Sequence, residues 1–168
     1  MKEIVKPLMQ WYAKHARTLP WRSDPTPYHV WLSEIMLQQT RVEAVIGYYD
    51  RFLEELPDVQ SLAAVSEERL LKLWEGLGYY NRARNLQKAA VQICEQYQGK
   101  FPESYEEWLA LPGIGAYTAG AVTSIAFGKK EAAVDGNVYR IYTRLYADDT
   151  EISKTAFQRN VRETVKEA

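Results

Sequence analysis

The amino-acid sequence predicts an all-α fold. Apolar residues recur at spacings of three and four along most of the 168 residues, as they do in amphipathic helices. No run of useful length alternates between apolar and polar residues, which a half-buried strand would require. Proline and glycine interrupt the helical pattern at several points and divide it into short helices. We therefore expect a series of helices that share one core or form two small lobes.

The first predicted helix ends near Pro20 and has on one face Ile4, Leu8, Trp11 and Tyr12. The connector at 23–27 contains two prolines, each of which disfavours helix in the residue before it. Four further helices are expected at about 28–39, 41–56, 66–76 and 82–98. Asp58 and Ser66 are suitable N-cap residues.

In the second half of the chain, Ser104 and Glu107 have the spacing of a capping box, which begins a helix that ends at Pro112. The next helix is expected at about 116–127, before a glycine that favours a helix end. Two more helices complete the chain and begin at Asp135 and Ser153.

Composition excludes several classes of protein. The hydrophobic fraction of 46% and the charged fraction of 26% are those of an ordinary globular protein. No apolar run approaches the roughly 20 residues of a membrane span, and the N-terminus lacks a signal-peptide block, so we expect a cytoplasmic protein without membrane contact. Cys94 is the single cysteine, and His15 and His29 are far apart. We therefore expect no internal disulfide, no metal site and no four-cysteine cluster within this chain.

The net charge of −1 argues against a general nucleic-acid binder, but the charges are unevenly distributed. Residues 51–75 contain three basic and six acidic side chains, whereas residues 76–100 contain four basic and one acidic. A basic face of this kind can bind DNA in a salt-sensitive way. The alternative is that both segments are mixed, solvated helix faces.

The segment 111–120, Leu-Pro-Gly-Ile-Gly-Ala-Tyr-Thr-Ala-Gly, joins two helices through a hairpin. Gly113 and Gly115 permit positive φ and let another backbone approach closely. The N–H groups at the start of the second helix, with the positive end of its dipole, suit a phosphate oxygen. The alternative is an ordinary turn between helices, in which Pro-Gly is common.

Two carboxylates are candidates for chemistry. Glu34 lies on a mostly apolar helix face, where burial raises the pKa of a carboxyl and makes it a general acid near neutral pH. Asp135 precedes a helix, where it can serve as N-cap and stay ionised. One protonated and one ionised carboxyl form the pair that cleaves glycosidic bonds. The alternatives are a Glu34 that reaches water or an arginine and an Asp135 that only caps its helix.

The segment 76–84, Gly-Leu-Gly-Tyr-Tyr-Asn-Arg-Ala-Arg, begins the basic region. Leu77 and the tyrosines can wedge into a base stack while Arg82 and Arg84 contact phosphates. The alternative is a helix C-cap whose aromatic side chains fold into the core.

Together these motifs resemble those of the helix-hairpin-helix DNA glycosylases, the superfamily that includes endonuclease III, and within it the MutY-type adenine DNA glycosylase branch. The matching segments occur in the same order over most of the chain, at 19–22, 31–40, 75–80, 111–119 and 134–138. The string Ser-Glu-Ile-Met-Leu-Gln-Gln-Thr at 33–40 indicates the adenine branch. Tyr117 stands where the endonuclease III branch has the lysine that attacks the sugar, so the resemblance implies hydrolysis without strong lyase activity.

The resemblance implies a helix-hairpin-helix glycosylase fold of two helical lobes, with the active site in the cleft between them. One lobe spans about 20–133 and has six helices, with the helix-hairpin-helix at about 104–127. The other combines 1–19 with 134–168. The implied partner is double-stranded DNA, the implied substrate is adenine mispaired with 8-oxoguanine or guanine, and the protein is expected to be a monomer.

The resemblance also implies residue roles. The catalytic residues are Glu34, Asp135, Tyr117 and Asn137. DNA or the flipped adenine is expected to contact Leu19, Arg22, Gln39, Thr40, Leu77, Tyr79, Gly113 and Gly115. In this scheme Glu34 protonates N7 of adenine and then guides water, while Asp135 stabilises the cationic sugar by its charge or through a transient bond. Gln39 and Tyr79, with Leu77, enter the base stack.

Members of the adenine DNA glycosylase family usually continue with a four-cysteine loop that binds a [4Fe–4S] cluster and then a domain that recognises 8-oxoguanine. Neither is expected within these residues, so the second lobe is expected to be incomplete at its C-terminus. A monovalent cation held by backbone carbonyl groups of the hairpin is a further expectation. Two other functions stay open: a non-catalytic DNA-binding fragment of such an enzyme, and a bifunctional glycosylase/lyase.

Overall fold

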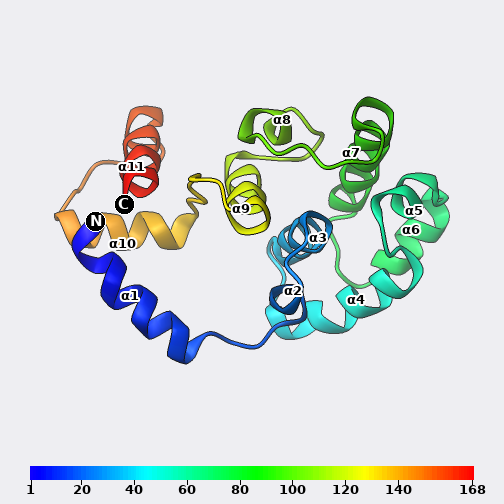
Figure 1. The fold of residues 1–168 in the computed structure, drawn as a ribbon, viewed down its shortest axis with the longest axis horizontal. Helices are drawn as coiled ribbons and strands as arrows, with labels where there is room; N and C mark the ends of the chain where they lie inside the picture. The colour runs from blue at the N-terminus through cyan, green and yellow to red at the C-terminus, as the bar shows by residue number, and fades with distance from the viewer.

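The computed structural model describes residues 1–168 and contains eleven α-helices and no β-strand, which confirms the all-α prediction (Figure 1). In chain order the helices are α1 Lys2–His15, α2 Pro20–Ser23, α3 Pro27–Leu37, α4 Val42–Glu55, α5 Val59–Ala64, α6 Glu67–Trp74, α7 Asn81–Tyr97, α8 Tyr105–Leu109, α9 Ala116–Phe127, α10 Gly136–Tyr146 and α11 Thr155–Glu167. A membrane span is not found among them, since none has the necessary length and hydrophobicity.

Eight helices, not the expected six, lie between residues 20 and 133. The additional helix α2 begins at Pro20, because proline suits the first helical position, where its missing N–H would have no partner. The additional helix α5 follows Asp58, whose carboxylate accepts a hydrogen bond from the Ser61 N–H at 2.7 Å. These helices have four and six residues, too few to show a helical period in the sequence.

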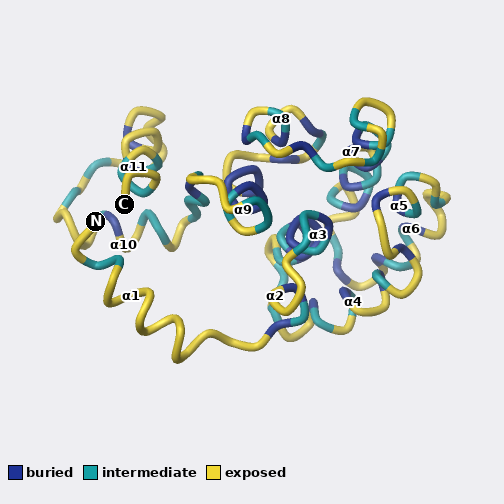
Figure 2. The backbone as a smooth tube through the Cα atoms, in the orientation of Figure 1, coloured by how far each residue is buried: buried dark blue, intermediate teal, exposed yellow.

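The core surrounds α3, which is apolar on nearly every side and has seven of its eleven residues buried. This helix packs against α9 and α4 and also contacts α2 and α7. The rings of Trp31 and Trp108 meet edge to face with their centres 5.7 Å apart, and Trp74 is also fully buried. Altogether 28 buried residues between Leu19 and Val122 form one cluster (Figure 2). The main core cluster is therefore built around the helix that carries Glu34.

A separate cluster of three buried residues, Tyr142, Phe157 and Val161, joins α10 to α11. The predicted amphipathic helix α1 is present, but none of its residues is buried (Figure 2). It begins beside α10, where the Met1 amino group contacts the Tyr146 hydroxyl, and it leads back to α2 (Figure 1). The chain thus crosses between the two clusters twice, once after α1 and once after α9.

The turn between α8 and α9 is the predicted hairpin. Gly113 has a φ of +75°, and a Cβ there would lie 2.7 Å from the Cβ of Asn85. Both the backbone conformation and the available space therefore require glycine at this position. Gly115 has a φ of −98° and does not use the positive φ that glycine permits. It is the N-cap of α9 and has no side chain to cover the first N–H groups of that helix.

Candidate active site

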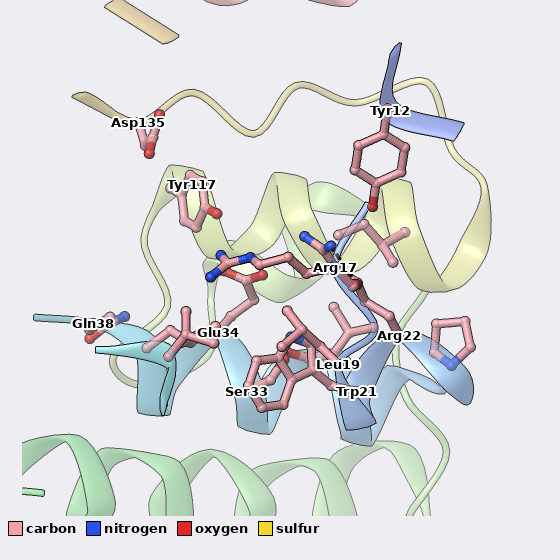
Figure 3. A pocket seen from close by; sticks show the side chains of 15 residues that line it. Tyr12, Arg17, Leu19, Trp21, Arg22, Ser33, Glu34, Gln38, Tyr117 and Asp135 are labelled. Atoms are coloured by element: carbon pink, nitrogen blue, oxygen red, sulfur yellow. Dashed lines mark hydrogen bonds between the residues drawn. The ribbon is translucent and has the colours of Figure 1, made fainter. Parts of the chain in front are cut away.

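A cavity of about 540 Å³ lies where α3, α9, the segment from α1 to α2 and the start of α10 meet (Figure 3). Pockets of roughly 300–1,000 Å³ are typical of small-molecule sites. Its wall includes five residues that the sequence predicts for function, namely Leu19, Arg22, Glu34, Tyr117 and Asp135. Residues more than 100 positions apart in the sequence therefore share one cavity.

Glu34 points from α3 into this cavity (Figure 3). The helix begins with Pro27 after the N-cap Thr26, whose hydroxyl oxygen accepts from the His29 N–H at 3.2 Å. Burial raises the pKa of the Glu34 carboxyl. The Tyr117 hydroxyl and the Arg22 guanidinium lower this pKa in part, while Asp135 raises it further. Because burial is the largest effect, Glu34 takes up a proton more readily than an exposed glutamate does.

Tyr117 lies in the first turn of α9, between Glu34 and Asp135 in the view of Figure 3. Burial, followed by the negative charges of Glu34 and Asp135, raises the pKa of its hydroxyl. The hydroxyl therefore keeps its proton and can donate it in a hydrogen bond to the Glu34 carboxylate. The side chain remains accessible from the cavity, since Tyr117 is 37% exposed.

Asp135 is the N-cap of α10. Its Oδ1 accepts from the backbone N–H groups of Asn137 and Val138, both at 2.9 Å. Its Oδ2 accepts from the Asn137 side-chain amide at 2.7 Å. These three bonds fix the orientation of the carboxylate, and the positive end of the α10 dipole attracts its negative charge. Asp135 is thus a helix cap and also part of the cavity wall, and the Asn137 amide holds its carboxylate in place.

Arg22 reaches the cavity from α2. Its Nη1 donates to the carbonyl oxygen of Arg17 at 3.2 Å, and its guanidinium lies 5.6 Å from the ring centre of Tyr12. Tyr12 and Arg17 also line the cavity. The sequence places Tyr12 only on an apolar helix face and gives Arg17 no pattern, so neither is predicted there. The other wall residues without a predicted role are Trp21, Pro25, Val30, Ser33, Leu37, Gln38, Val42 and Ile125.

The remaining predicted DNA contacts lie outside the cavity, on turns. Gln39 and Tyr79 have left-handed backbone conformations, with φ of 57° and 48°. Both side chains are exposed, Tyr79 to 64%. Thr40 follows Gln39 directly, and Gly113 lies in the hairpin. The structure therefore exposes Gln39, Tyr79 and Gly113 to solvent and leaves Thr40 half-buried, and it brings none of them to the cavity.

The side chain of Leu77 is buried, unlike those of Gln39 and Tyr79. It is only 6% exposed and belongs to the main core cluster, so in this structure its side chain does not project from the turn, and its entry into a base stack stays a prediction. The turn after α6, with positive φ at Gly76 and Gly78, directs Leu77 inward and leaves Tyr79 outside. The alternative, a helix C-cap whose aromatic side chains fold into the core, does not hold for Tyr79 and Tyr80, which are both exposed.

The two arginines of this segment have protein partners. Arg84 donates from Nε to the Glu67 carboxylate at 2.7 Å. Arg82 donates to backbone carbonyl groups, among them that of Ile35 at 2.9 Å. Both guanidinium groups therefore have partners within the protein, and their contact with phosphates stays a prediction. The sequence could not show these partners, because they lie 17 and 47 residues away.

A [4Fe–4S] cluster requires four ligands, usually cysteine thiolates. Cys94 lies on α7 with its thiol 3.8 Å from the carbonyl oxygen of Val59, and it is the only cysteine of these 168 residues. Residues 1–168 therefore do not fit such a cluster. No group of three or more His, Cys, Asp or Glu side chains is placed to hold a metal ion. The monovalent cation at the hairpin stays a prediction.

The cavity combines a carboxyl that is readily protonated with a carboxylate fixed at a helix N-terminus. The first, Glu34, can give a proton to a leaving group. The second, Asp135, can stabilise positive charge that develops on a sugar. Tyr117 and Arg22 favour the ionised form of Glu34 once its proton has left. The arrangement suits the cleavage of a glycosidic bond.

Comparison with known proteins gives a consistent result. The HhH-GPD superfamily of base excision DNA repair proteins matches residues 32–167. The adenine DNA glycosylase of Buchnera aphidicola subsp. Baizongia pistaciae is 45% identical over 141 residues, which cover 83% of this chain and 40% of that protein. The human adenine DNA glycosylase is 45% identical over 157 residues, which cover 88% of this chain and 29% of that protein. The chain thus spans less than half the length of these relatives.

Two solved structures have the same fold over nearly the whole chain. A thermostable thymine-DNA glycosylase matches with a TM-score of 0.89 and 28% identity, over 99% of this chain and 76% of that chain. A trapped covalent intermediate of endonuclease III with DNA matches with a TM-score of 0.81 and 26% identity, over 98% of this chain and 74% of that chain. Glu34, Tyr117, Asp135 and Asn137 all lie within the matched range of residues 32–167.

Proposed function

Because this chain belongs to the HhH-GPD superfamily of base excision DNA repair proteins, we propose that it is the catalytic region of an adenine DNA glycosylase. Its reaction is hydrolysis of the N-glycosidic bond of an adenine in double-stranded DNA, where the adenine is paired with 8-oxoguanine or guanine. The relatives named adenine DNA glycosylase support the choice of base. The structure of endonuclease III trapped on DNA supports DNA as the partner.

The observation that carries the proposal is the presence of Glu34 and Asp135 in the wall of one cavity, with a raised pKa at Glu34. In the reaction, the target adenine leaves the duplex and enters this cavity. Glu34 gives its proton to N7 of the adenine. The bond between N9 and C1′ then breaks, its electron pair stays with the base, and the sugar becomes an oxocarbenium-like cation.

Asp135 stabilises this cation by its charge or through a transient bond to C1′. Water then attacks C1′, and its proton goes to the Glu34 carboxylate, which restores the acid. The Tyr117 hydroxyl donates to Glu34 while Glu34 is ionised, and the Asn137 amide keeps Asp135 in place. The products are free adenine and an abasic sugar in an intact strand.

We propose a monofunctional enzyme because α9 contains no lysine, and Tyr117 lies in its first turn. A lysine there would form a Schiff base with the sugar and open a route to strand cleavage. Trapping with borohydride therefore separates the two mechanisms. A covalent adduct of this chain with abasic DNA would support the bifunctional glycosylase/lyase instead.

The test is single-turnover release of adenine from a duplex with one 8-oxoguanine·adenine pair. The parent is compared with Glu34→Gln and with Glu54→Gln, a control at an exposed position of α4. We expect release by the parent and by Glu54→Gln, and DNA binding without release by Glu34→Gln. Release by Glu34→Gln at the parent rate would contradict the role of Glu34. DNA binding without release by any of the three would support a non-catalytic DNA-binding fragment.

A further inference from the structure

Two exposed turns that are distant in sequence are joined by one side chain, Arg82 in the first turn of α7. One turn follows α3 and carries Gln39, and the other follows α6 and carries Tyr79. Arg82 Nη1 reaches the end of α3, where its distances to carbonyl oxygens are 2.9 Å to Ile35, 3.0 Å to Met36 and 2.6 Å to Gln38. A single nitrogen thus contacts two carbonyl groups in the last turn of the helix that carries Glu34 and the carbonyl group of its C-cap residue.

The other terminal nitrogen, Nη2, reaches the second turn. It lies 3.0 Å from the carbonyl oxygen of Leu77 and 3.3 Å from that of Gly78. It also lies 3.4 Å from the hydroxyl oxygen of Thr40. The guanidinium is planar, so its two terminal nitrogens hold the two turns at a fixed separation.

Arg82 contacts the equivalent carbonyl group in both turns. In each, a carbonyl that accepts from Arg82 belongs to the residue directly before a left-handed residue, so Gln38 precedes Gln39 and Gly78 precedes Tyr79. A residue other than glycine rarely adopts this backbone conformation, so the surrounding structure must hold Gln39 and Tyr79 in it. Because Arg82 anchors the peptide group that enters each left-handed residue, it fixes the direction in which each exposed side chain leaves its turn.

Arg82 has no carboxylate partner to account for its position. The ion pairs of the structure include Arg17, Arg69, Arg84 and Arg162 but not Arg82. Burial lowers the pKa of its guanidinium, so placing the charge here has a cost in free energy. The guanidinium also lies 5.5 Å from the ring centres of both Trp74 and Tyr79. The compensation for its burial comes from the carbonyl groups at the end of α3, from those of the two turns and from these two rings.

We propose that Arg82 is a positioning residue that makes Gln39 and Tyr79 enter the base stack as one unit. The inference rests on the proposed function, since it requires that the two turns face DNA. A displacement of either turn changes the hydrogen bonds that hold the other, because both use the same guanidinium. The unit is also tied to the helix of Glu34, because Ile35 and Met36 directly follow that residue.

The first test compares Arg82→Lys with the parent. Lysine keeps the charge, but its one ammonium group cannot hold both turns at a fixed separation. The control is Arg69→Lys, which alters an exposed pair with Glu55, at 2.9 Å from Nε, between the first turn of α6 and the end of α4. Circular dichroism and thermal midpoints establish that each variant is folded.

The probe is a duplex with 2-aminopurine beside an 8-oxoguanine·adenine pair whose adenosine carries a 2′-fluoro group, so that the glycosidic bond stays intact. At saturating protein we expect the parent and Arg69→Lys to raise the fluorescence equally as the bases unstack. Arg82→Lys should give a rise several-fold smaller. Its single-turnover release from unmodified duplex should be slower by about tenfold or more, the effect of losing one or two hydrogen bonds to a charged donor. A rise equal to that of the parent would overturn the proposal.

A second test keeps Arg82 in place, so it decides the matter even if Arg82→Lys does not fold. It measures the fluorescence change for Gln39→Ala, Tyr79→Ala and the double variant. If the two side chains act as one unit, each single substitution causes nearly the loss of the double variant. Independent, additive losses overturn the proposal. If the parent binds DNA but neither unstacks it nor releases adenine, the proposed function fails, whereas release with additive losses rejects the coupling alone.

Discussion

Replacing Gly120 by alanine is expected to destabilise the protein although the position is helical. Gly120 is buried in α9, where this helix passes the segment that leads to Asp135. A Cβ at this position would lie 2.2 Å from the carbonyl oxygen of Ala132 and 2.8 Å from its carbon. Both are backbone atoms that cannot rotate away, so the segment must move by about 1 Å to restore normal contact.

Two effects of opposite sign determine how much the free energy of unfolding changes in Gly120→Ala. Alanine gains up to about 1 kcal/mol over glycine in a helix interior. Overpacking of a filled site costs about 1–3 kcal/mol, and a clash with rigid backbone belongs at the upper end of that range. We therefore expect Gly120→Ala to lower the free energy of unfolding by about 1–2 kcal/mol. Adenine release should fall further, to about a hundredth, because the shift displaces Asp135 relative to Glu34.

Urea denaturation measures the stability change, with Gly47→Ala as the matched control. Gly47 is also helical, in α4, but it is exposed and a Cβ there would meet nothing within 4 Å. Only the helix propensity acts at that position, so Gly47→Ala should be stabilised by up to about 1 kcal/mol. If Gly120→Ala proved as stable as Gly47→Ala, the close approach of α9 to Ala132 would be refuted.

Two further predictions concern the carboxyl groups of the cavity. Asparagine at position 135 keeps an acceptor for the N–H groups of Asn137 and Val138, so Asp135→Asn should retain stability in urea denaturation, whereas Asp135→Ala should lose about 1 kcal/mol. Both variants should lose adenine release, and release by Asp135→Asn at the parent rate would show that the charge is not needed. Because burial raises the pKa of Glu34, the folded state binds its proton more tightly than the unfolded chain does. The stabilisation from protonated Glu34 is complete below the pKa of the unfolded chain and is lost as pH rises through the higher folded pKa. The stability of Glu34→Gln relative to the parent should therefore increase as pH rises above about 4, and a difference independent of pH would contradict the burial of this group.

The helices could be predicted where their signals are local. Ser104 and Glu107 form the capping box that their spacing predicts, with the Ser104 hydroxyl oxygen 3.3 Å from the Glu107 N–H. Asp58 caps a helix as expected, but the helix it begins is too short to be recognised by period. α2 is hidden for the same reason. In addition, the sequence pattern takes Pro20 as the end of the first helix, which in the structure already ends at His15.

The residues of the candidate site also differ in how far the sequence could predict them. Glu34 and Asp135 could be proposed from short motifs, because helix position and capping chemistry depend on neighbouring residues. Tyr117 is expected only from the resemblance to a known family. The inward direction of Leu77 and the contacts of Arg82 could not be predicted, because they depend on how distant helices pack. The same holds for Tyr12 and Arg17, which reach the cavity because the chain leads from α1 back to α2 (Figure 1).

The most direct test of the central claim is the pH dependence of single-turnover adenine release from a duplex with one 8-oxoguanine·adenine pair. If buried Glu34 is the acid, the rate constant is high while its carboxyl is protonated and falls as pH rises through its pKa. Since burial raises that pKa, the fall should occur at a higher pH than the ordinary titration of glutamate, and Glu34→Gln should show no release at any pH. A rate constant that stays level through this range, or release by Glu34→Gln, would contradict the assignment.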